Sequence, residues 1–244
     1  MPTLISGVKL GRKASSRAVR HNTFKSITMP KEHDLARVSR TGIIAVIRAS
    51  SGEQLVDVAE ALLAGGVEVM EVTFTVPRAT AVLEQVASRL GSKILLGAGT
   101  VLDTETARIA LLSGAEFIVA PTTNLDVIRL CQRYDKMVMP GALTPTEVLT
   151  AWEAGADIVK IFPSELTGPG YLKALKAPLP QVRLMPTGGV NLDTAATFLK
   201  SGAYALGIGG SLIEPKALAD KDMARIESLA RQYVEIVRKE REAK

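Results

Sequence analysis

The chain has 244 residues, a formal net charge of +5 and 47% hydrophobic residues, so it can bury a sizeable core as one large domain or two small ones. Its apolar runs fall well short of the roughly 18 residues that a membrane-spanning helix needs, which excludes a membrane protein. One cysteine, Cys131, excludes a disulfide framework, and the two histidines, His21 and His33, precede the first predicted strand, so we expect no metal site in the folded body.

Residues 1–30 carry much of the positive charge, with six basic residues and no acidic ones. The rest of the chain is nearly neutral and only 4% of all residues are aromatic, so we expect no nucleic-acid binding. We predict that residues 1–30 are a basic, disordered extension before a single domain over residues 31–244. The alternatives are an organelle transit peptide, typical of Arg- and Ser-rich segments, or a true start at Met29. Otherwise we expect a cytoplasmic protein, because one free cysteine fits a reducing compartment.

From Thr41 onward, short apolar runs rich in β-branched residues alternate with amphipathic helical patterns. The predicted strands cover residues 43–48, 67–75, 94–98, 116–120, 137–140, 157–163, 183–186 and 203–208. The predicted helices cover residues 52–63, 77–90, 104–112, 125–133, 145–154, 171–176, 193–200 and 223–239. Such alternation predicts right-handed crossovers and a parallel sheet.

A glycine-containing turn recurs where a helix is predicted to end and a strand to begin. It occurs as Ala64-Gly65-Gly66, Ser113-Gly114-Ala115, Ala154-Gly155-Ala156 and Ser201-Gly202-Ala203. Glycine adopts the left-handed conformation that closes a helix C-terminus. Eight such strand–helix units in about 200 residues predict an α/β fold of the (β/α)8 TIM-barrel type. A doubly wound sheet is the alternative, although no Gly-x-Gly-x-x-Gly follows the first strand.

The predicted strand 157–163 carries a lysine, Lys160, inside an apolar run bounded by Gly155 and Pro163. Burial disfavours the charged ammonium and lowers its pKa, leaving some free amine near neutral pH. A free amine in a water-poor pocket can attack a carbonyl and form a Schiff base. The alternative is a lysine whose stem lies on apolar surface while its ammonium reaches water.

A carboxylate interrupts another apolar strand. Glu71, Thr73 and Thr75 alternate along the predicted strand 67–75 and therefore share one face. In a barrel the active site lies at the carboxyl ends of the strands. A buried carboxylate and Lys160 facing inward together would tune each other's pKa for acid–base catalysis. The alternative is a structural buried ion pair.

Two glycine pairs follow the seventh and eighth predicted strands, in Thr187-Gly188-Gly189 and Gly209-Gly210-Ser211. Barrels often bind phosphate there, because glycine lets backbone N–H groups approach the phosphate oxygens and a following helix N-terminus adds partial positive charge. The alternative is a pair of ordinary turns. Arg48, at the end of the first strand, could hold a substrate carboxylate or form an ion pair at the rim.

Several motifs occur together in a characteristic order. They are Gly65-Gly66-Val67, Glu71-Val72-Thr73, Gly97-Ala98-Gly99-Thr100-Val101, Lys160-Ile161-Phe162-Pro163, Pro186-Thr187-Gly188-Gly189-Val190 and Gly209-Gly210-Ser211. With these motifs, residues 41–213 resemble the 2-dehydro-3-deoxy-6-phosphogluconate (KDPG) aldolase family, also called KDPG/4-hydroxy-2-oxoglutarate aldolases. The resemblance implies a class I aldolase without metal or cofactor, acting as a homotrimer on a phosphorylated 2-keto-3-deoxy sugar acid.

The resemblance also implies roles for individual residues. Lys160 matches the Schiff-base lysine and Glu71 the carboxylate that moves protons. The residues that match the pyruvate pocket are Thr100, Pro121 and Phe162, and those that match the phosphate site are Thr187, Gly188, Gly189, Gly209, Gly210 and Ser211.

One position departs from much of the family. Many members have an arginine four residues after the glutamate, and this chain has Thr75 there. Some such members have an arginine at the end of strand one, as Arg48 is here, and so do members that act on the galactonate epimer. The expected reaction is cleavage of KDPG to pyruvate and glyceraldehyde 3-phosphate. The alternatives are 2-dehydro-3-deoxy-6-phosphogalactonate or 4-hydroxy-2-oxoglutarate as substrate, or a non-catalytic phosphosugar-binding scaffold.

Overall fold

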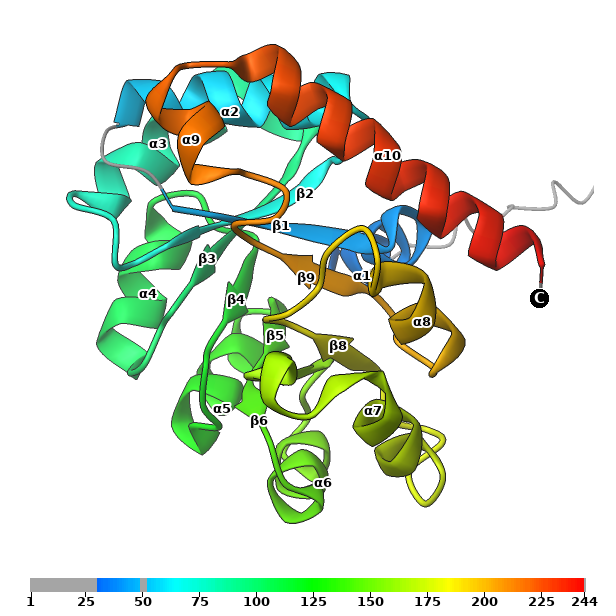
Figure 1. Ribbon diagram of the computed structural model, residues 1–244. Coiled ribbons are helices and arrows are strands. Elements are labelled where there is room, and N and C mark those ends of the chain that lie inside the picture. The colour runs from blue at the N-terminus through cyan, green and yellow to red at the C-terminus, as the bar shows by residue number, and fades with distance from the viewer. Residues whose placement is uncertain (1–29, 49–51, 244) are drawn as a thin grey trace, which may run out of the picture.

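Parallel strands alternate with helices in the computed structural model, which describes residues 30–48 and 52–243 (Figure 1). The strands are β1 (Ile43–Ile47), β2 (Val69–Thr73), β3 (Leu95–Gly99), β4 (Phe117–Val119), β5 (Met137–Met139), β6 (Gly141–Ala142), β7 (Val159–Ile161), β8 (Leu184–Pro186) and β9 (Leu206–Ile208). The main helices are α1 (Pro30–Thr41), α2 (Gly52–Ala64), α3 (Ala79–Leu90), α4 (Thr104–Leu112), α5 (Leu125–Arg133), α6 (Pro145–Glu153), α7 (Gly168–Lys176), α8 (Ala195–Lys200), α9 (Pro215–Ala219) and α10 (Met223–Glu242). Short 3-10 helices are η1 (Gly91–Lys93) and η2 (Ser164–Leu166). Within the described ranges, no helix is both long and apolar enough to cross a membrane.

The strands form two sheets in which every pairing is parallel. One sheet has the order β5-β4-β3-β2-β1-β9 and the other the order β6-β7-β8. The sequence predicted one strand over residues 137–140, whereas the structure has β5 and β6 on either side of Pro140, which has no N–H to donate to a neighbouring strand. The fold is therefore α/β, with a parallel sheet that forms a half-barrel and helices around it (Figure 1). The predicted extension over residues 1–30 lies almost wholly outside the described residues.

The predicted glycine turns are confirmed as helix ends. Gly66, Gly114, Gly155 and Gly202 have φ angles of 91°, 103°, 97° and 98°. In each turn the next residue donates its N–H to a carbonyl five residues earlier, as in Val67 to Leu62. This is the Schellman arrangement, which satisfies the last helical carbonyls and turns the chain towards the following strand.

The buried apolar side chains form two clusters, one on each face of the strands. A larger cluster lies between strands and helices. A smaller one, here called the interior cluster, consists of Val38, Ile44, Val69, Leu95, Phe117, Val119, Met137, Met139, Ile158, Met185 and Ala205. Because side chains two residues apart in a strand lie on the same face, the interior cluster identifies which later strand residues also point inward.

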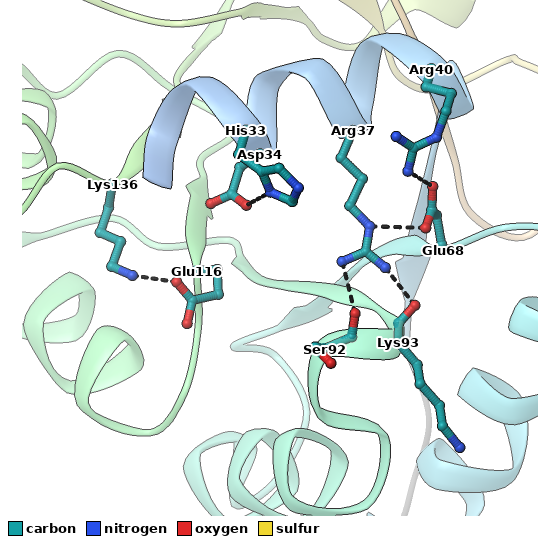
Figure 2. A network of polar contacts seen from close by, with 9 residues as sticks. All are labelled: His33, Asp34, Arg37, Arg40, Glu68, Ser92, Lys93, Glu116 and Lys136. Carbon is teal, nitrogen blue, oxygen red and sulfur yellow. Dashed lines mark hydrogen bonds and ion pairs between the residues drawn. The ribbon is translucent and has the colours of Figure 1, made fainter. Parts of the chain in front are cut away.

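Helix α1 was not predicted from the sequence, and it lies against the amino-terminal ends of the strands (Figure 2). Its Val38 belongs to the interior cluster. Its Arg37 donates from Nε to Glu68 Oε2 at 2.9 Å and from its two terminal nitrogens to the carbonyls of Ser92 at 3.2 Å and Lys93 at 2.5 Å. The helix thus fastens the segments that lead into β2 and β3.

Arg37→Ala is expected to lower the free energy of unfolding by about 2–4 kcal/mol, because a charged donor is removed from one carboxylate and two carbonyls. Arg37 is 9% exposed. Arg40 is the matched control: it also bonds Glu68, at 2.6 Å, but its side chain is 66% exposed. Arg40→Ala should cost no more than ~1 kcal/mol. Urea denaturation of both variants tests this, and equal losses would contradict it.

Candidate active site

Strand geometry places Glu71 and Lys160 on the inward face. Each follows by two residues a member of the interior cluster, Val69 in β2 and Ile158 just before β7. Glu71 is 1% exposed and Lys160 is 5% exposed. Two ionisable side chains from strands far apart in the sequence are thus buried on the side that the interior cluster occupies.

The environment of Lys160 favours the free amine. Burial lowers the pKa of Lys160, the negative charge of Glu71 raises it, and the positive charge of Arg48 lowers it further. The Nζ atom lies 5.0 Å from the centre of the Phe162 ring. A lowered pKa is the property that a lysine needs to act as a nucleophile near neutral pH.

The environment of Glu71 favours its protonated form. Burial raises the pKa of Glu71, while the positive charges of Lys160 and Arg48 lower it. Its Oε2 atom is buried and has no hydrogen-bond partner among the described residues. In that part of the chain Glu71 and Lys160 also form no direct ion pair, which argues against the structural ion pair considered above. A carboxyl group without a partner remains available to exchange protons with a bound molecule.

Gly99, at the end of β3, provides the room that the Glu71 carboxyl group occupies. A Cβ atom at position 99 would lie 2.7 Å from Glu71 Oε1 and 2.8 Å from Cδ. Any side chain at this position would therefore displace the carboxyl group.

Gly99→Ala is expected to lower kcat by roughly 10² or more, because small misplacements of a catalytic group cost that much. Gly170→Ala in α7 is the control, since a Cβ there would meet nothing within 4 Å. Steady-state kinetics with the substrate proposed below provide the measurement. A Gly99→Ala enzyme with unchanged kcat would show that Glu71 needs no fixed position.

A cavity of about 450 Å³ is lined by Phe162, whose ring is 5.0 Å from Lys160 Nζ, and by Arg48, whose charge affects the pKa of both residues; Glu71 and Lys160 themselves are not in its lining. Its lining includes eight residues that the sequence analysis singled out: Arg48, Phe162, Thr187, Gly188, Gly189, Gly209, Gly210 and Ser211. Five further residues were not predicted as site residues: Val46, Glu165, Val190, Asn191 and Gly207. Glu165 is a carboxylate three residues after Phe162, and that position at a strand end was the signal that could have identified it.

The two glycine pairs form part of the cavity wall. Gly188 and Gly189 have φ angles of 88° and 70°, a conformation that side chains disfavour. The helices do not begin directly after the pairs, because α8 starts at Ala195 and α9 at Pro215. A helix does follow each pair, but a loop lies between them, so a bound anion would first meet loop N–H groups.

Two hydroxyl groups at the cavity differ in their bonding. Ser211 Oγ donates to the carbonyl of Val190 at 2.5 Å. Thr187 Oγ1 is buried and has no partner among the described residues. Since buried polar atoms are normally hydrogen-bonded, the Thr187 hydroxyl is available to a polar group of a bound molecule.

The other predicted site residues lie outside the cavity lining. Thr75 is exposed, its Oγ1 lies 2.8 Å from Thr73 Oγ1, and with Arg48 it lines a neighbouring cavity of about 440 Å³. Thr100 follows β3 with a φ of 59°, a strained conformation for a β-branched residue and one that clusters at functional sites. Pro121 follows β4 and is partly buried.

The arrangement can perform imine chemistry on an anionic substrate. It combines the buried amine of Lys160, the carboxyl group of Glu71, which can exchange protons, and a glycine-lined cavity whose lining includes Arg48. In the described part of the chain, no three His, Cys, Asp or Glu side chains come together as metal ligands.

Comparisons with known proteins agree with this chemistry. A sequence profile of the KDPG and KHG aldolase family matches residues 35–229. The chain is 35% identical over 202 residues to the 2-dehydro-3-deoxy-phosphogluconate aldolase of Treponema pallidum (strain Nichols), covering 82% of this chain and 95% of that protein. It is 32% identical over 196 residues to the 2-dehydro-3-deoxy-6-phosphogalactonate aldolase of Escherichia coli (strain K12), covering 80% and 96%. The chain is also similar to the crystal structure of the KDPG aldolase from Legionella pneumophila, in which pyruvate is captured at low pH as a covalent carbinolamine intermediate. The TM-score is 0.76 and the sequence identity 28%, and the match covers 84% of this chain and 97% of that one. The chain therefore belongs to the KDPG and KHG aldolase family.

Proposed function

We propose that the protein is a class I aldolase that cleaves KDPG to pyruvate and glyceraldehyde 3-phosphate. The observation that carries this proposal is the burial of Lys160 and Glu71 on one inward face, with the pKa of the amine lowered and that of the carboxyl group raised, chiefly by burial. Intact amine and carboxyl groups also argue against a non-catalytic scaffold.

In the proposed reaction the Lys160 amine attacks the C2 carbonyl of the substrate and forms a carbinolamine. Glu71 donates the proton with which the hydroxyl leaves as water, and a protonated imine results. Glu71, now a carboxylate, removes the proton of the C4 hydroxyl, the C3–C4 bond breaks, and its electrons pass into the imine to give an enamine. Glyceraldehyde 3-phosphate leaves as the aldehyde. Glu71 then protonates C3 of the enamine, and hydrolysis releases pyruvate and the free amine.

The substrate is proposed to lie with its keto end at Lys160 and its phosphate at the glycine pairs. Phe162, Thr100 and Pro121 would surround the pyruvate portion, as the family resemblance implies. Arg48 would hold the substrate carboxylate; it lines the cavity and is close enough to Glu71 and Lys160 to affect both pKa values. The phosphate would take N–H groups from Gly188, Gly189, Gly209, Gly210 and Ser211, which line the same cavity as Thr187. Binding the remote phosphate would supply energy that orients the reacting carbons.

The proposal includes a closed (β/α)8 barrel in a single domain over residues 31–244. A parallel bridge between Thr187 and Gly207, which joins the end of β8 to β9, supports closure on one side. On the other side, β5 and β6 are separated by Pro140 alone. A homotrimer is also proposed, as the resemblance implies. Exposed apolar side chains on and near α4 support it: Leu102, Ile109 and Leu112 are 52%, 49% and 69% exposed.

The test is pyruvate release from three substrates under the same conditions: KDPG, its C4 epimer 2-dehydro-3-deoxy-6-phosphogalactonate, and 4-hydroxy-2-oxoglutarate. KDPG is expected to have the highest kcat/KM. The epimer is the second candidate, because one of the relatives above is named for it and Arg48 stands at the end of strand one. Faster turnover of the epimer would replace KDPG as the substrate, and no pyruvate from any of the three would refute an aldolase.

A further inference from the structure

Glu165 is an acidic side chain that lines the cavity of about 450 Å³. It lies in η2, directly after Ser164, whose Oγ donates to the carbonyl of Ile161 at 2.7 Å and accepts the N–H of Thr187 at 3.2 Å. These two bonds tie the start of η2 to the ends of β7 and β8. The backbone of Glu165 is therefore held at a fixed place on the wall of the cavity.

Glu165 packs against both glycines that follow β8. A Cβ atom at Gly189 would lie 2.8 Å from Glu165 Cα, and one at Gly188 would lie 3.7 Å from the carboxyl carbon of Glu165. The carboxyl group therefore stands beside the glycine pair, on the wall of the cavity that Phe162 and Ser211 also line. Among the described residues, it makes no hydrogen bond or ion pair, so both oxygens are available to a bound molecule.

A carboxylate at this place is at odds with simple phosphate binding. An ionised carboxylate is only an acceptor of hydrogen bonds, as phosphate oxygens also are, and the two negative charges repel. A carboxylate is, however, a strong acceptor for a hydroxyl group. The bound group that faces Glu165 should thus be a donor that lies next to the phosphate.

We propose that Glu165 is a specificity-determining residue that accepts a hydrogen bond from the C5 hydroxyl, on the carbon beside the phosphate ester. This assignment rests on the proposed function. The C4 hydroxyl loses its proton in the reaction and lies at Glu71, and the phosphate lies at the glycine pairs. The C5 hydroxyl is the donor between them along the substrate chain.

The reverse reaction allows a direct test. C3 of pyruvate adds to the aldehyde carbon, which becomes C4, and the hydroxyl at C2 of glyceraldehyde 3-phosphate becomes the C5 hydroxyl of the product. Its deoxy analogue, 3-oxopropyl phosphate, has the aldehyde and the phosphate but lacks this hydroxyl. The ratio of kcat/KM for the two aldehydes, each with pyruvate, therefore reports on recognition of the hydroxyl alone.

The wild-type enzyme should prefer glyceraldehyde 3-phosphate by about 10-fold or more, because a site built for a hydroxyl rejects an analogue without it. Glu165→Ala should bring the preference to within about 3-fold, and Glu165→Gln, which keeps an acceptor oxygen, should lie between them. Glu153→Gln, at the exposed end of α6, is the control and should keep the wild-type preference. The ratio does not depend on the fraction of folded enzyme.

A wild-type preference in Glu165→Ala would overturn the assignment. If that preference came with an equal gain in kcat/KM for both aldehydes, Glu165 would merely repel phosphate. A wild-type enzyme that forms no product from pyruvate and either aldehyde would instead refute the proposed function, and this assignment with it.

Discussion

Lys160→Ala is expected to abolish the pyruvate adduct that borohydride traps and to reduce KDPG cleavage by on the order of 10³ or more. The reason is that the reaction requires a covalent imine, and alanine offers no nucleophile. After reduction of the wild-type adduct, mass spectrometry should find the added mass on the peptide that contains residues 157–163.

Lys173 and Lys176, in α7, are the controls for this experiment. Lys173 is exposed, and Lys176 Nζ already donates to the carbonyls of Pro180 at 2.7 Å and Val182 at 2.8 Å. Neither belongs to the inward face of a strand. Lys173→Ala and Lys176→Ala should therefore retain the adduct, and an adduct that survives Lys160→Ala but is lost in either of them would move the nucleophile to α7.

Glu71→Gln is expected to lower kcat for cleavage by about 10² to 10⁴, which is the usual contribution of a general acid–base group. The amide is nearly the same size, so the space beside Gly99 stays filled. Because Lys160 is intact, pyruvate should still be trapped by borohydride, but more slowly. Full-rate cleavage by this variant would show that a different group moves the protons.

The pH dependence of the two enzymes should differ in a defined direction. In the wild type, activity should rise with pH as Lys160 loses its proton and fall as Glu71 loses the proton that it must donate. Glu71 carries no charge while it holds its proton, so the neutral amide of Glu71→Gln should leave the rising limb of Lys160 near its wild-type position. The variant should lose the falling limb that Glu71 causes, because the amide has no such proton to lose. Single-turnover imine formation across pH measures both limbs, and a falling limb that persists in Glu71→Gln would contradict the role assigned to Glu71.

Much of the fold could be predicted because local signals were strong. The four glycine turns follow from the conformation that a helix end requires, and their positive φ angles are confirmed. Helix α1 could not be predicted from its pattern, because its sequence, PKEHDLARVSRT, is mostly polar and it is stabilised by distant contacts such as those of Arg37. The break at Pro140 was likewise set by strand pairing.

The candidate site was predictable in its chemistry and less so in its geometry. A lysine and a glutamate in apolar strands were visible in the sequence, and the structure has both in strands and buried. The sequence could not show that Arg48 and Glu165, distant in the chain, line one cavity, because that depends on how the strands are arranged in space.

Helix α1 and the Arg37 contacts lie at the amino-terminal end of the strands (Figure 2). The cavity, in contrast, is lined by residues that directly follow the carboxyl ends of β1, β7, β8 and β9. Heat tolerance and turnover are consequently open to separate adjustment. Substitutions that strengthen the contacts of α1 can raise the melting temperature without altering substrate preference. Substitutions that reshape the cavity can change which sugar acid is accepted, while the contacts of α1 keep the enzyme folded.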